Sequence, residues 1–372
     1  MLASTLGIRL ILWLGRTVPT PAPLAVLNAL TNVEVTNDAS QGDGFQMTFS
    51  LSKELTGDYD LLSGGALAPL TRVIVGVVMG VTPEVLIDGI ITHHQLTPSN
   101  DPGQSTLTVT GRDVSTMLDL HERNDSYPNQ PDSVIVLRLL ASYAQYGLAP
   151  QITPTTDVPL IIDHIPRQQE TDLRFIQRLA QRNGFVFYIE PLTFGVNTAY
   201  WGPETRLGLP QPALTVHMGS FTNVKTLNFS NDALAPVSTE SSIQEPLTRL
   251  SIPIPSLPAL RLPPLAGSPA PAQRSVILRE SANQNAAEAV TAAVAAATRA
   301  PDAVSGDGEL EAVRYGSVLR ARRVVGLRGA GTSYDGNYYV RRVTHVIAAG
   351  EYTQRFTISR EGTGSLLPVV RP

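Results

Sequence analysis

Apolar and polar residues alternate along the first third of the chain, as they do in half-buried β-strands. The segments with this alternation are VEVTND (33–38), FQMTFSLS (45–52) and STLTVTGRD (105–113). RVIVGVVMG (72–80) is apolar almost throughout, which predicts a strand covered on both sides. VLIDGIITHHQL (85–96) predicts the first strand of a hairpin that STLTVTGRD completes. Short strands at this spacing are typical of an antiparallel barrel or sandwich.

Between residues 121 and 192 the pattern changes to a helical period. SVIVLRLLASYAQYGL (133–148) predicts a helix that Ser133 caps and Gly147 ends. ETDLRFIQRLAQRNG (170–184) predicts a second helix, which runs directly into the strand FVFYIE (185–190). Apolar residues fall on one face of this second helix. They are Leu173, Ile176, Leu179 and Ala180.

The second helix carries signals at both of its ends. Thr171 can cap the first turn, and Asp172 lies near the positive end of the helix dipole. Asn183-Gly184 suits a left-handed stop. Glu170 and Asp172 are two residues apart and would not face each other from adjacent turns. We therefore interpret them as charges that stabilise a helix end rather than as an acid–base pair.

The remainder of the chain mixes strands, a proline-rich stretch and one helix. Eight prolines between Pro246 and Pro271 exclude a regular core element and predict an extended arm. NQNAAEAVTAAVAAATRA (283–300) predicts an alanine-rich helix that Pro301 ends. The further predicted strands are ALTVHMG (213–219), VKTLNFS (224–230), SVLRARRVVGL (317–327), NYYVRRVTHVIA (337–348) and EYTQRFTISREG (351–362).

Two predicted hairpins far apart in the chain resemble each other. Residues 90–113 and 342–362 each hold a strand with Thr-His, a loop and a second strand. In this alignment Thr92-His93 matches Thr344-His345, Leu107 and Val109 match Phe356 and Ile358, and Arg112-Asp113 matches Arg360-Glu361. A chance match of two hairpins and a true internal duplication are both open. A duplication would mean two related β-domains with other material inserted between them.

The composition narrows the possible functions. A net charge of −4 gives no electrostatic reason to expect a nucleic-acid-binding protein. Charged residues are only 16% of the chain, which favours extensive burial within the chain or against partners. There is no cysteine, which excludes disulfides, thiol catalysis and Cys-based zinc sites. The apolar N-terminal segment lacks a basic region and is interrupted by Arg9, so we expect synthesis in the cytoplasm without a signal peptide and no membrane insertion.

No motif of the chain predicts catalysis or a cofactor. The six histidines (His93, His94, His121, His164, His217 and His345) lack helical metal-site spacing, and His93 and His94 on one strand would point to opposite faces. HExxH, GxSxG, P-loop and GxGxxG motifs are absent. The basic residues Arg314, Arg320, Arg322, Arg323 and Arg328 predict a solvated or subunit-facing strand rather than a nucleic-acid path. We predict no catalytic residue, no cofactor and no metal.

The segment RQQETDLRFIQRLAQRNGFVFYIE (167–190) resembles the motif of the central baseplate hub in contractile injection machines. This family includes late control D proteins of phage tails and the hub portion of VgrG spike proteins. The matching motif residues include Glu170, Thr171, Asp172, Phe175, Arg178, Leu179 and Gly184. DGNYYVRRVTHVIAAGEYTQRFTISREG (335–362) is similar to the closing hairpin of the family, with Tyr339 and His345 in familiar places.

The resemblance implies a mainly β, α+β fold with two related antiparallel β-barrel domains and a small inserted α/β domain. The expected boundaries are 1–120 for the first barrel, 121–192 for the inserted domain with its motif helix, 193–245 with 305–365 for the second barrel, and 246–304 for the proline-rich arm and the alanine-rich helix. The family further implies a homotrimer that adapts a three-fold spike, carried by a separate chain, to a six-fold inner tube.

The implied role is structural, in the baseplate of a phage tail or a phage-derived injection particle, with the inner tube protein, the spike and other baseplate components as partners. Two alternatives remain open from the sequence. One is a cell-envelope hydrolase, and the other is a sugar- or receptor-binding β-protein of the tail. The sequence does not distinguish a virus from a domesticated injection system, and it does not indicate which face meets tube or spike.

Overall fold

A computed structural model describes residues 8–52, 59–101, 103–157, 165–244, 251–254, 259–277 and 286–366. Strands make up 49% and helices 18% of the structure, so the predicted mainly β class is confirmed. His164 and parts of the predicted proline-rich arm lie outside the described residues. No helix within the described ranges is both long and apolar enough to cross a membrane.

Residues 8–113 form a β-unit that we call module 1. Its strands are β1 (Ile8–Gly15), β3 (Leu30–Asp38), β4 (Gly44–Leu51), β5 (Arg72–Met79), β6 (Thr82–Thr97) and β7 (Ser105–Asp113). Between them lie β2 (Thr20–Pro21), α1 (Leu24–Ala29) and α2 (Asp60–Ser63). The strands pair in the order β3-β4-β7-β6-β5-β1, and each of these pairs is antiparallel. The predicted hairpin is the pair β6–β7, and this prediction is confirmed.

A second β-unit, module 2, is assembled from residues 211–231 and 304–360. Its strands are β13 (Gln211–Thr215), β14 (Val224–Asn231), β19 (Val304–Glu311), β20 (Val324–Arg328), β21 (Gly336–Ala348) and β22 (Glu351–Arg360). They are joined by η3 (Gly219–Phe221), a 3-10 turn, and by α6 (Ala312–Tyr315). The strands pair in the order β14-β19-β22-β21-β20-β13, all antiparallel except β13 with β20.

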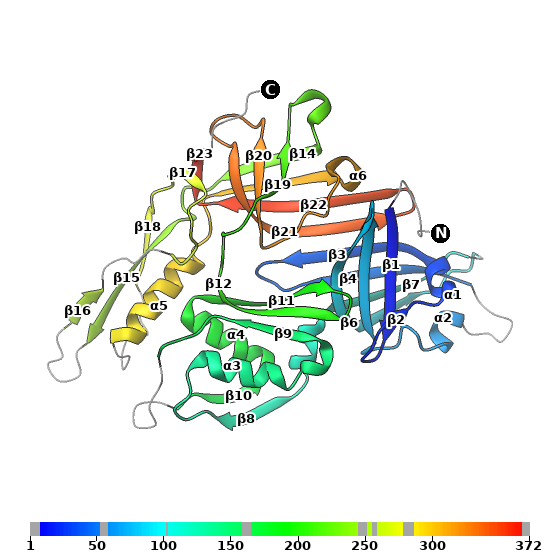
Figure 1. Cartoon of the computed structure of the whole chain (residues 1–372), viewed down its shortest axis with the longest axis horizontal. Helices are drawn as coiled ribbons and strands as arrows, with labels where there is room; N and C mark the ends of the chain where they lie inside the picture. Colours follow the sequence, from blue (N-terminus) through cyan, green and yellow to red (C-terminus); the bar gives the residue numbers. More distant parts are fainter. Residues whose placement is uncertain are drawn as a thin grey trace.

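A small α+β unit lies between the two modules in the chain. Its elements are η1 (Val114–Leu118), β8 (Glu122–Ser126), α3 (Asp132–Ala141), η2 (Ala144–Tyr146), β9 (Leu148–Ile152), β10 (Arg167–Thr171), α4 (Asp172–Asn183), β11 (Phe185–Thr193) and β12 (Val196–Pro203). The strands form a sheet β11-β12-β9 and a ribbon β10-β8. The helices α3 and α4 lie between the sheet and the ribbon (Figure 1).

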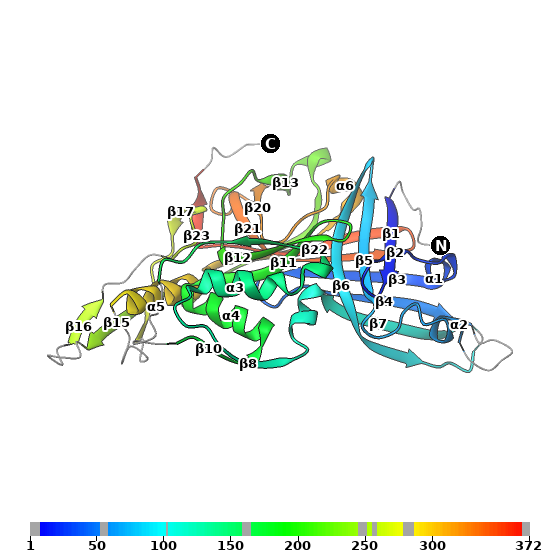
Figure 2. The ribbon, with the colours of Figure 1, turned by 60° about the horizontal axis from the view of Figure 1, so that its bottom comes forward.

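A second insertion separates β14 from β19. It holds β15 (Val237–Gln244), β16 (Ser251–Ile254), β17 (Ala266–Pro269), β18 (Arg274–Ile277) and the helix α5 (Ala286–Arg299). β15 pairs with β16 and β18, and this small sheet extends away from the modules beside α5 (Figure 2). β17 pairs with β23 (Gly362–Ser365), the strand that follows module 2. The predicted alanine-rich helix is confirmed as α5.

Three large hydrophobic cores lie within the described residues. The core of module 1 also includes Ile347 and Tyr352 from module 2. The second core lies in the α+β unit around Trp201 and the apolar face of α4, and the third fills module 2. The predicted domain boundaries remain a prediction. Strand pairing places β12 with the α+β unit and β15 with the second insertion.

Two local predictions are wrong. The helix α3 begins at Asp132 with Pro131 as its N-cap, because the Pro131 carbonyl accepts the Val134 and Ile135 N–H groups, while the Ser133 hydroxyl accepts the Thr155 N–H instead of capping. This helix ends at Ala141, and Gly147 instead ends the short turn η2. The strand predicted from residue 317 begins only at Val324.

Candidate functional site

The two modules have the same strand order. When the six main strands of each module are numbered along the chain, both sheets have the order second, third, sixth, fifth, fourth, first. A shared order in two stretches of one chain indicates a duplicated unit. The sheets differ in one respect, because the first strand is antiparallel to the fourth in module 1 and parallel to it in module 2.

Single backbone details repeat at equivalent places. Leu70 (φ 65°) and Arg322 (φ 63°) both adopt the left-handed conformation, which is uncommon for residues other than glycine. Leu70 N–H donates to the Ile91 carbonyl at 2.9 Å, and Arg322 N–H donates to the Val340 carbonyl at 2.8 Å. The strand bulges immediately after Ile91 on β6 and immediately after Val340 on β21. These details align Ile91 with Val340 and Leu70 with Arg322.

The strands β3 and β14 correspond in the same way. Each has an irregularity directly after its first paired residue, Leu30 or Val224. Counted from there, LTNVEVTNDA (30–39) aligns with VKTLNFSNDA (224–233), and both end in Thr/Ser-Asn-Asp-Ala. Asp38 and Asp232 each accept an N–H from two residues further on, at 2.7 and 2.8 Å. This short repeat was the signal in the sequence that the pattern analysis missed.

The sequence comparison matched the correct hairpins in the wrong register. The structural landmarks align Val109 with Phe356, two residues from the Ile358 match made on sequence. They also align His93 with Arg342 rather than with His345. The two Thr-His dipeptides occupy positions of β6 and β21 that are not equivalent, so their identity is coincidental.

The C-terminal half of β21 pairs with β3 and joins the modules into one sheet. We call this pairing the junction. It runs antiparallel from Arg342 opposite Asp38 to Ala348 opposite Asn32. Arg342 Nε donates to Asp38 Oδ2 at 2.6 Å. A strand edge that could pair with another chain is thereby used inside the molecule.

Further along the junction, polar and buried pairs alternate. The hydroxyl groups of Thr36 and Thr344 lie 3.0 Å apart, and either can be the donor. Val35 and His345 stand directly opposite each other and are both 0% exposed. Opposed pairs of this kind stabilise a sheet and fix its register.

A buried ion pair lies behind the junction. Arg322 donates to both carboxylate oxygens of Asp43, at 2.5 and 3.1 Å, and to the Asp38 carbonyl at 2.6 Å. Burial alone would lower the pKa of Arg322, but the Asp43 charge outweighs it and raises that pKa above its usual value. The guanidinium also covers the ring of Tyr188 at 4.5 Å. Arg322 therefore connects module 2 to module 1 and to the α+β unit.

The predicted basic cluster is not one surface. Arg320 donates to Glu84 at 2.9 Å and to the Val85 carbonyl, both on β6. Arg323 pairs with Glu190 at 3.0 Å. Together with buried Arg322, these arginines reach three different partners, because the irregular segment before β20 turns each side chain in its own direction. Arg314 and Arg328 are exposed.

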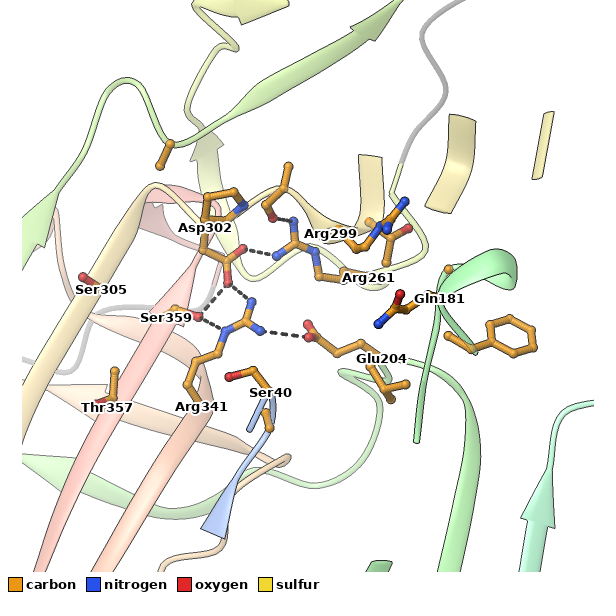
Figure 3. A pocket seen from close by; sticks show the side chains of 18 of the residues that line it. Ser40, Gln181, Glu204, Arg261, Arg299, Asp302, Ser305, Arg341, Thr357 and Ser359 are labelled. Atoms are coloured by element: carbon orange, nitrogen blue, oxygen red, sulfur yellow. Dashed lines mark hydrogen bonds and ion pairs between the residues drawn. The ribbon is translucent and has the colours of Figure 1, made fainter. Parts of the chain in front are cut away.

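A second charged network surrounds Asp302 (Figure 3). Its carboxylate binds Arg206, Arg261 and Arg341 at 2.9 to 3.0 Å and accepts a hydrogen bond from Ser359 at 2.6 Å. Burial alone would raise the pKa of Asp302, but the three guanidinium groups outweigh it and hold that pKa below its usual value.

The side chains of Arg261, Asp302, Arg341 and Ser359 line a cavity of about 760 Å³ between the ends of α4 and α5 and the module 2 sheet. Glu204, another carboxylate of the lining, binds Arg206 and Arg341. A carboxylate held ionised by several arginines is a poor proton donor. The network is therefore suited to fastening the second insertion to module 2. Within the described ranges, no group of three or more His, Asp and Glu side chains is placed to hold a metal ion.

Of the predicted motif residues, His345 and Tyr339 belong to module 2. His345 Nδ1 lies 3.0 Å from the Tyr352 hydroxyl. Burial, and secondarily the Arg320 charge, lowers the pKa of His345 to about 3, so its ring is neutral. The buried ring of Tyr339 lies beneath the guanidinium groups of Arg206 and Arg341, at 5.6 and 5.4 Å.

The other motif residues build the helix α4. Thr171 Oγ1 accepts the Arg174 N–H, as the capping prediction requires, and Gly184 ends the helix at φ 68°. The helix packs through Phe175 and Leu179, which are at most 1% exposed. A Cβ on Gly184 would lie 2.8 Å from the Ala295 Cα, so the α4 end closely approaches α5.

Of the two acids of the motif, Asp172 lies in the first turn of α4, as predicted, and Glu170 precedes the helix. Asp172 is 0% exposed and accepts hydrogen bonds from Tyr143 and Gln168, both at 2.7 Å, besides pairing with Arg123. Glu170 lies on β10 and pairs with Arg178 at 2.6 Å. The structure thus brings the helix motif together as a scaffold and places Tyr339 and His345 in module 2.

Comparisons with known proteins agree with this architecture. No family model matches the chain, and no curated protein matches its sequence significantly. A tail protein of Neisseria meningitidis is 13% identical, with a TM-score of 0.61 over 96% of this chain and 98% of that one. The 43 kDa tail protein of prophage MuSo2 from Shewanella oneidensis is also 13% identical, with a TM-score of 0.62 over 95% and 98%.

A third similar structure is a component of the type VI secretion system of E. coli, described as structurally similar to the T4 tail proteins gp27 and gp5. It is 14% identical, with a TM-score of 0.55 over 92% of this chain and 77% of that one. The predicted resemblance is confirmed for the fold: this chain has the fold of these phage tail proteins and of this type VI secretion system component.

Proposed function

We propose that the chain is the structural hub of a contractile phage tail or phage-derived injection particle. Three copies would close a ring of six similar modules, which lets a three-fold spike meet a six-fold inner tube. The observation that carries this proposal is the duplication: two modules with one strand order, joined edge to edge within one chain. The fold shared with tail and secretion-system proteins supports a structural role in such a particle.

The partners follow from the same geometry. A ring of six modules presents six similar surfaces on each face, as a hexameric tube requires, while its three chains provide three-fold symmetry for a spike. The spike, the inner tube protein and other baseplate components are the proposed partners, in a particle assembled after synthesis in the cytoplasm. Contraction of a sheath would then drive hub and tube forward together. The role is mechanical and needs neither a catalytic residue nor a cofactor.

Light scattering on the purified chain tests the proposal. We expect a particle of three times the 39.9 kDa chain mass, either alone or after addition of a spike protein. A stable homodimer would contradict the proposal, because a two-fold assembly of four modules cannot match a six-fold tube.

A further inference from the structure

Two strand edges correspond to the junction but have no strand paired to them among the described residues. β6 pairs with β5 only from Thr82 to Ile90, and Ile91 still bonds to Leu70 and Thr71, so residues 92–97 leave one edge open. β14 pairs with β19 on one side and ends the sheet order on the other. We call these the open edge of β6 and the open edge of β14. His93, Gln95 and Thr97 on β6 are exposed.

The open edges are the counterparts of the two strands that meet in the junction. β6 is equivalent to β21, and its residues His93, Gln95 and Leu96 align with Arg342, Thr344 and His345. Arg342, Thr344 and His345 pair with β3 in the junction. An edge that is closed in module 2 is therefore open in module 1.

β14 is equivalent to β3 and shows the converse. Phe229, Ser230 and Asp232 align with Val35, Thr36 and Asp38. On β3 these residues are covered by β21, whereas Ser230 and Asp232 are exposed and Phe229 is half-buried. Each chain thus carries two unused halves of the junction, one on β14 at the end of the sheet and one on the second half of β6, beyond its pairing with β5.

We propose that the open edge of β6 pairs antiparallel with the open edge of β14 of a second copy, in the register that joins β21 to β3. This inference rests on the proposed trimer and names the contact that closes it. His93 then faces Asp232 of the next copy, as Arg342 faces Asp38. Gln95 faces Ser230 of the next copy, as Thr344 faces Thr36.

The side chains suit this pairing. A histidine opposite an aspartate repeats the basic–acidic pair of the junction, where the two groups lie 2.6 Å apart. Leu96, 40% exposed, would stand opposite Phe229 of the next copy and be covered. Its counterpart His345 is fully buried within the chain. Exposed backbone edges are a liability that folded proteins cover, and this contact covers two of them in every copy.

The contact also explains how a ring can close. The edges that meet are different surfaces, so the association is heterologous, and such contacts form rings when their rotation closes. The junction joins the two modules of one chain edge to edge, and the proposed contact joins modules of neighbouring chains in the same way. Six modules would then alternate internal and external joints of one kind.

Cross-linking tests the register directly, because the chain contains no cysteine. The variant Gln95→Cys/Ser230→Cys places two thiols at directly opposed positions of neighbouring copies. After mild oxidation, we expect covalent dimers and trimers on a non-reducing denaturing gel. Mixing the two single variants should give covalent dimers only.

Two controls match this variant. Thr36→Cys/Thr344→Cys places the thiols at the equivalent positions of the junction and should cross-link within the chain without a change in mass. Gln95→Cys/Asn231→Cys moves one thiol to the other face of β14, and we expect its yield to fall at least about tenfold because successive strand residues point to opposite faces.

Charge reversal provides a second measurement. Asp232→Arg should weaken trimer formation about tenfold or more, a change of about 1.4 kcal/mol. The double variant His93→Asp/Asp232→Arg should recover most of this loss, since it restores opposite charges. Both residues are exposed in the single chain, but Asp232→Arg also removes the hydrogen bond from the Leu234 N–H. Thermal unfolding of each variant as a monomer therefore serves as the control for folding.

The outcomes separate the two proposals. A trimer that cross-links at Gln95 and Ser230 supports the contact. A trimer that fails to cross-link there, or that charge reversal leaves unchanged, overturns the contact while the hub proposal stands. A chain that stays monomeric or forms a dimer at high concentration and with the spike overturns the hub proposal, and the contact with it.

Discussion

Module 1 and module 2 share a strand order but differ in what lies between their strands. In module 1 a short turn connects β3 to β4, whereas in module 2 the equivalent strands β14 and β19 are separated by α5 and four short strands. The left-handed residue, its hydrogen bond and the adjacent bulge are nevertheless the same in both. The difference teaches that the edge geometry is what the two copies share, and the connections are free to vary.

The cores of the modules reach the same shape by different packing. In module 1 the ring of Phe45 on β4 lies against Gly111 of β7. Module 2 has Gly306 in the place of Phe45, and the ring there comes from Phe229 on β14. The two cores therefore take their large ring from different strands, β4 in module 1 and β14 in module 2.

The largest expected effect comes from the ion pair behind the junction. Arg322→Met leaves the Asp43 carboxylate buried without its partner, and we expect a loss of about 3–5 kcal/mol in the free energy of unfolding. The neighbouring Arg323→Met removes a pair whose arginine side chain is 56% exposed, and it should cost less than about 1 kcal/mol. Urea denaturation of both variants measures the difference. Equal losses would show that the pair does not support the junction.

The second effect is a pH dependence of stability that comes from His345 in the junction. The pKa of His345 is lowered to about 3, below the unfolded value of about 6.5, so the unfolded chain takes up the proton first. The resulting stability is complete above pH 6.5 and is lost as the pH falls toward 3. Between pH 7 and pH 5 we expect a loss of about 2 kcal/mol.

The variant His345→Leu puts a leucine at this position, as module 1 has at the equivalent Leu96. Its stability should be lower at pH 7, since the Tyr352 hydroxyl loses its partner, but nearly flat between pH 7 and pH 5. Thermal unfolding at a series of pH values gives the comparison. A variant with the same slope as the natural chain would exclude His345 as the cause.

A smaller effect tests the exchanged packing. A Cβ on Gly306 would lie 2.8 Å from the ring of Phe229, so Gly306→Ala should cost about 1–3 kcal/mol through overpacking. Adding Phe229→Leu should recover part of this loss, because the smaller side chain makes room. A double-mutant cycle of unfolding free energies measures the coupling. Strict additivity of the two changes would contradict the packing difference between the modules.

The smallest effect concerns the left-handed residue of module 1. Leu70 is 50% exposed, so Leu70→Asn loses little packing, and asparagine tolerates φ near 65° better than leucine. We expect a gain of about 0.5 kcal/mol in unfolding free energy. Leu207→Asn is the control, because Leu207 is 75% exposed and does not have a positive φ. Its unfolding free energy should not change. A loss at Leu70 would show that its side chain matters more than its backbone.

Much of the fold could be predicted from the sequence because its signals are local. Alternation over 45–52 and the caps Thr171 and Gly184 each act within a few residues, and the structure has β4 and α4 there. The duplication was predicted only from the similar hairpins, and the short repeat at 30–39 and 224–233 was missed, since positions such as Phe45 and Gly306 leave little identity to align.

The candidate interface was less predictable, because it depends on contacts distant in the chain. Arg322 and Asp43 are far apart in sequence, and nothing near Arg322 indicates that it is buried while Arg323 is exposed. Asp172 likewise carries a helix-start signature, although its partner Tyr143 lies on another element. A sequence also gives no signal for a strand edge that stays unpaired, because pairing depends on the arrangement of the whole sheet.

Electron cryo-microscopy of the assembled chain tests the central claim most directly. The account predicts a three-fold ring of six similar lobes, in which β6 of each copy continues into β14 of the next. A two-fold dimer, or a three-fold assembly in which the β14 edge faces solvent, would contradict it.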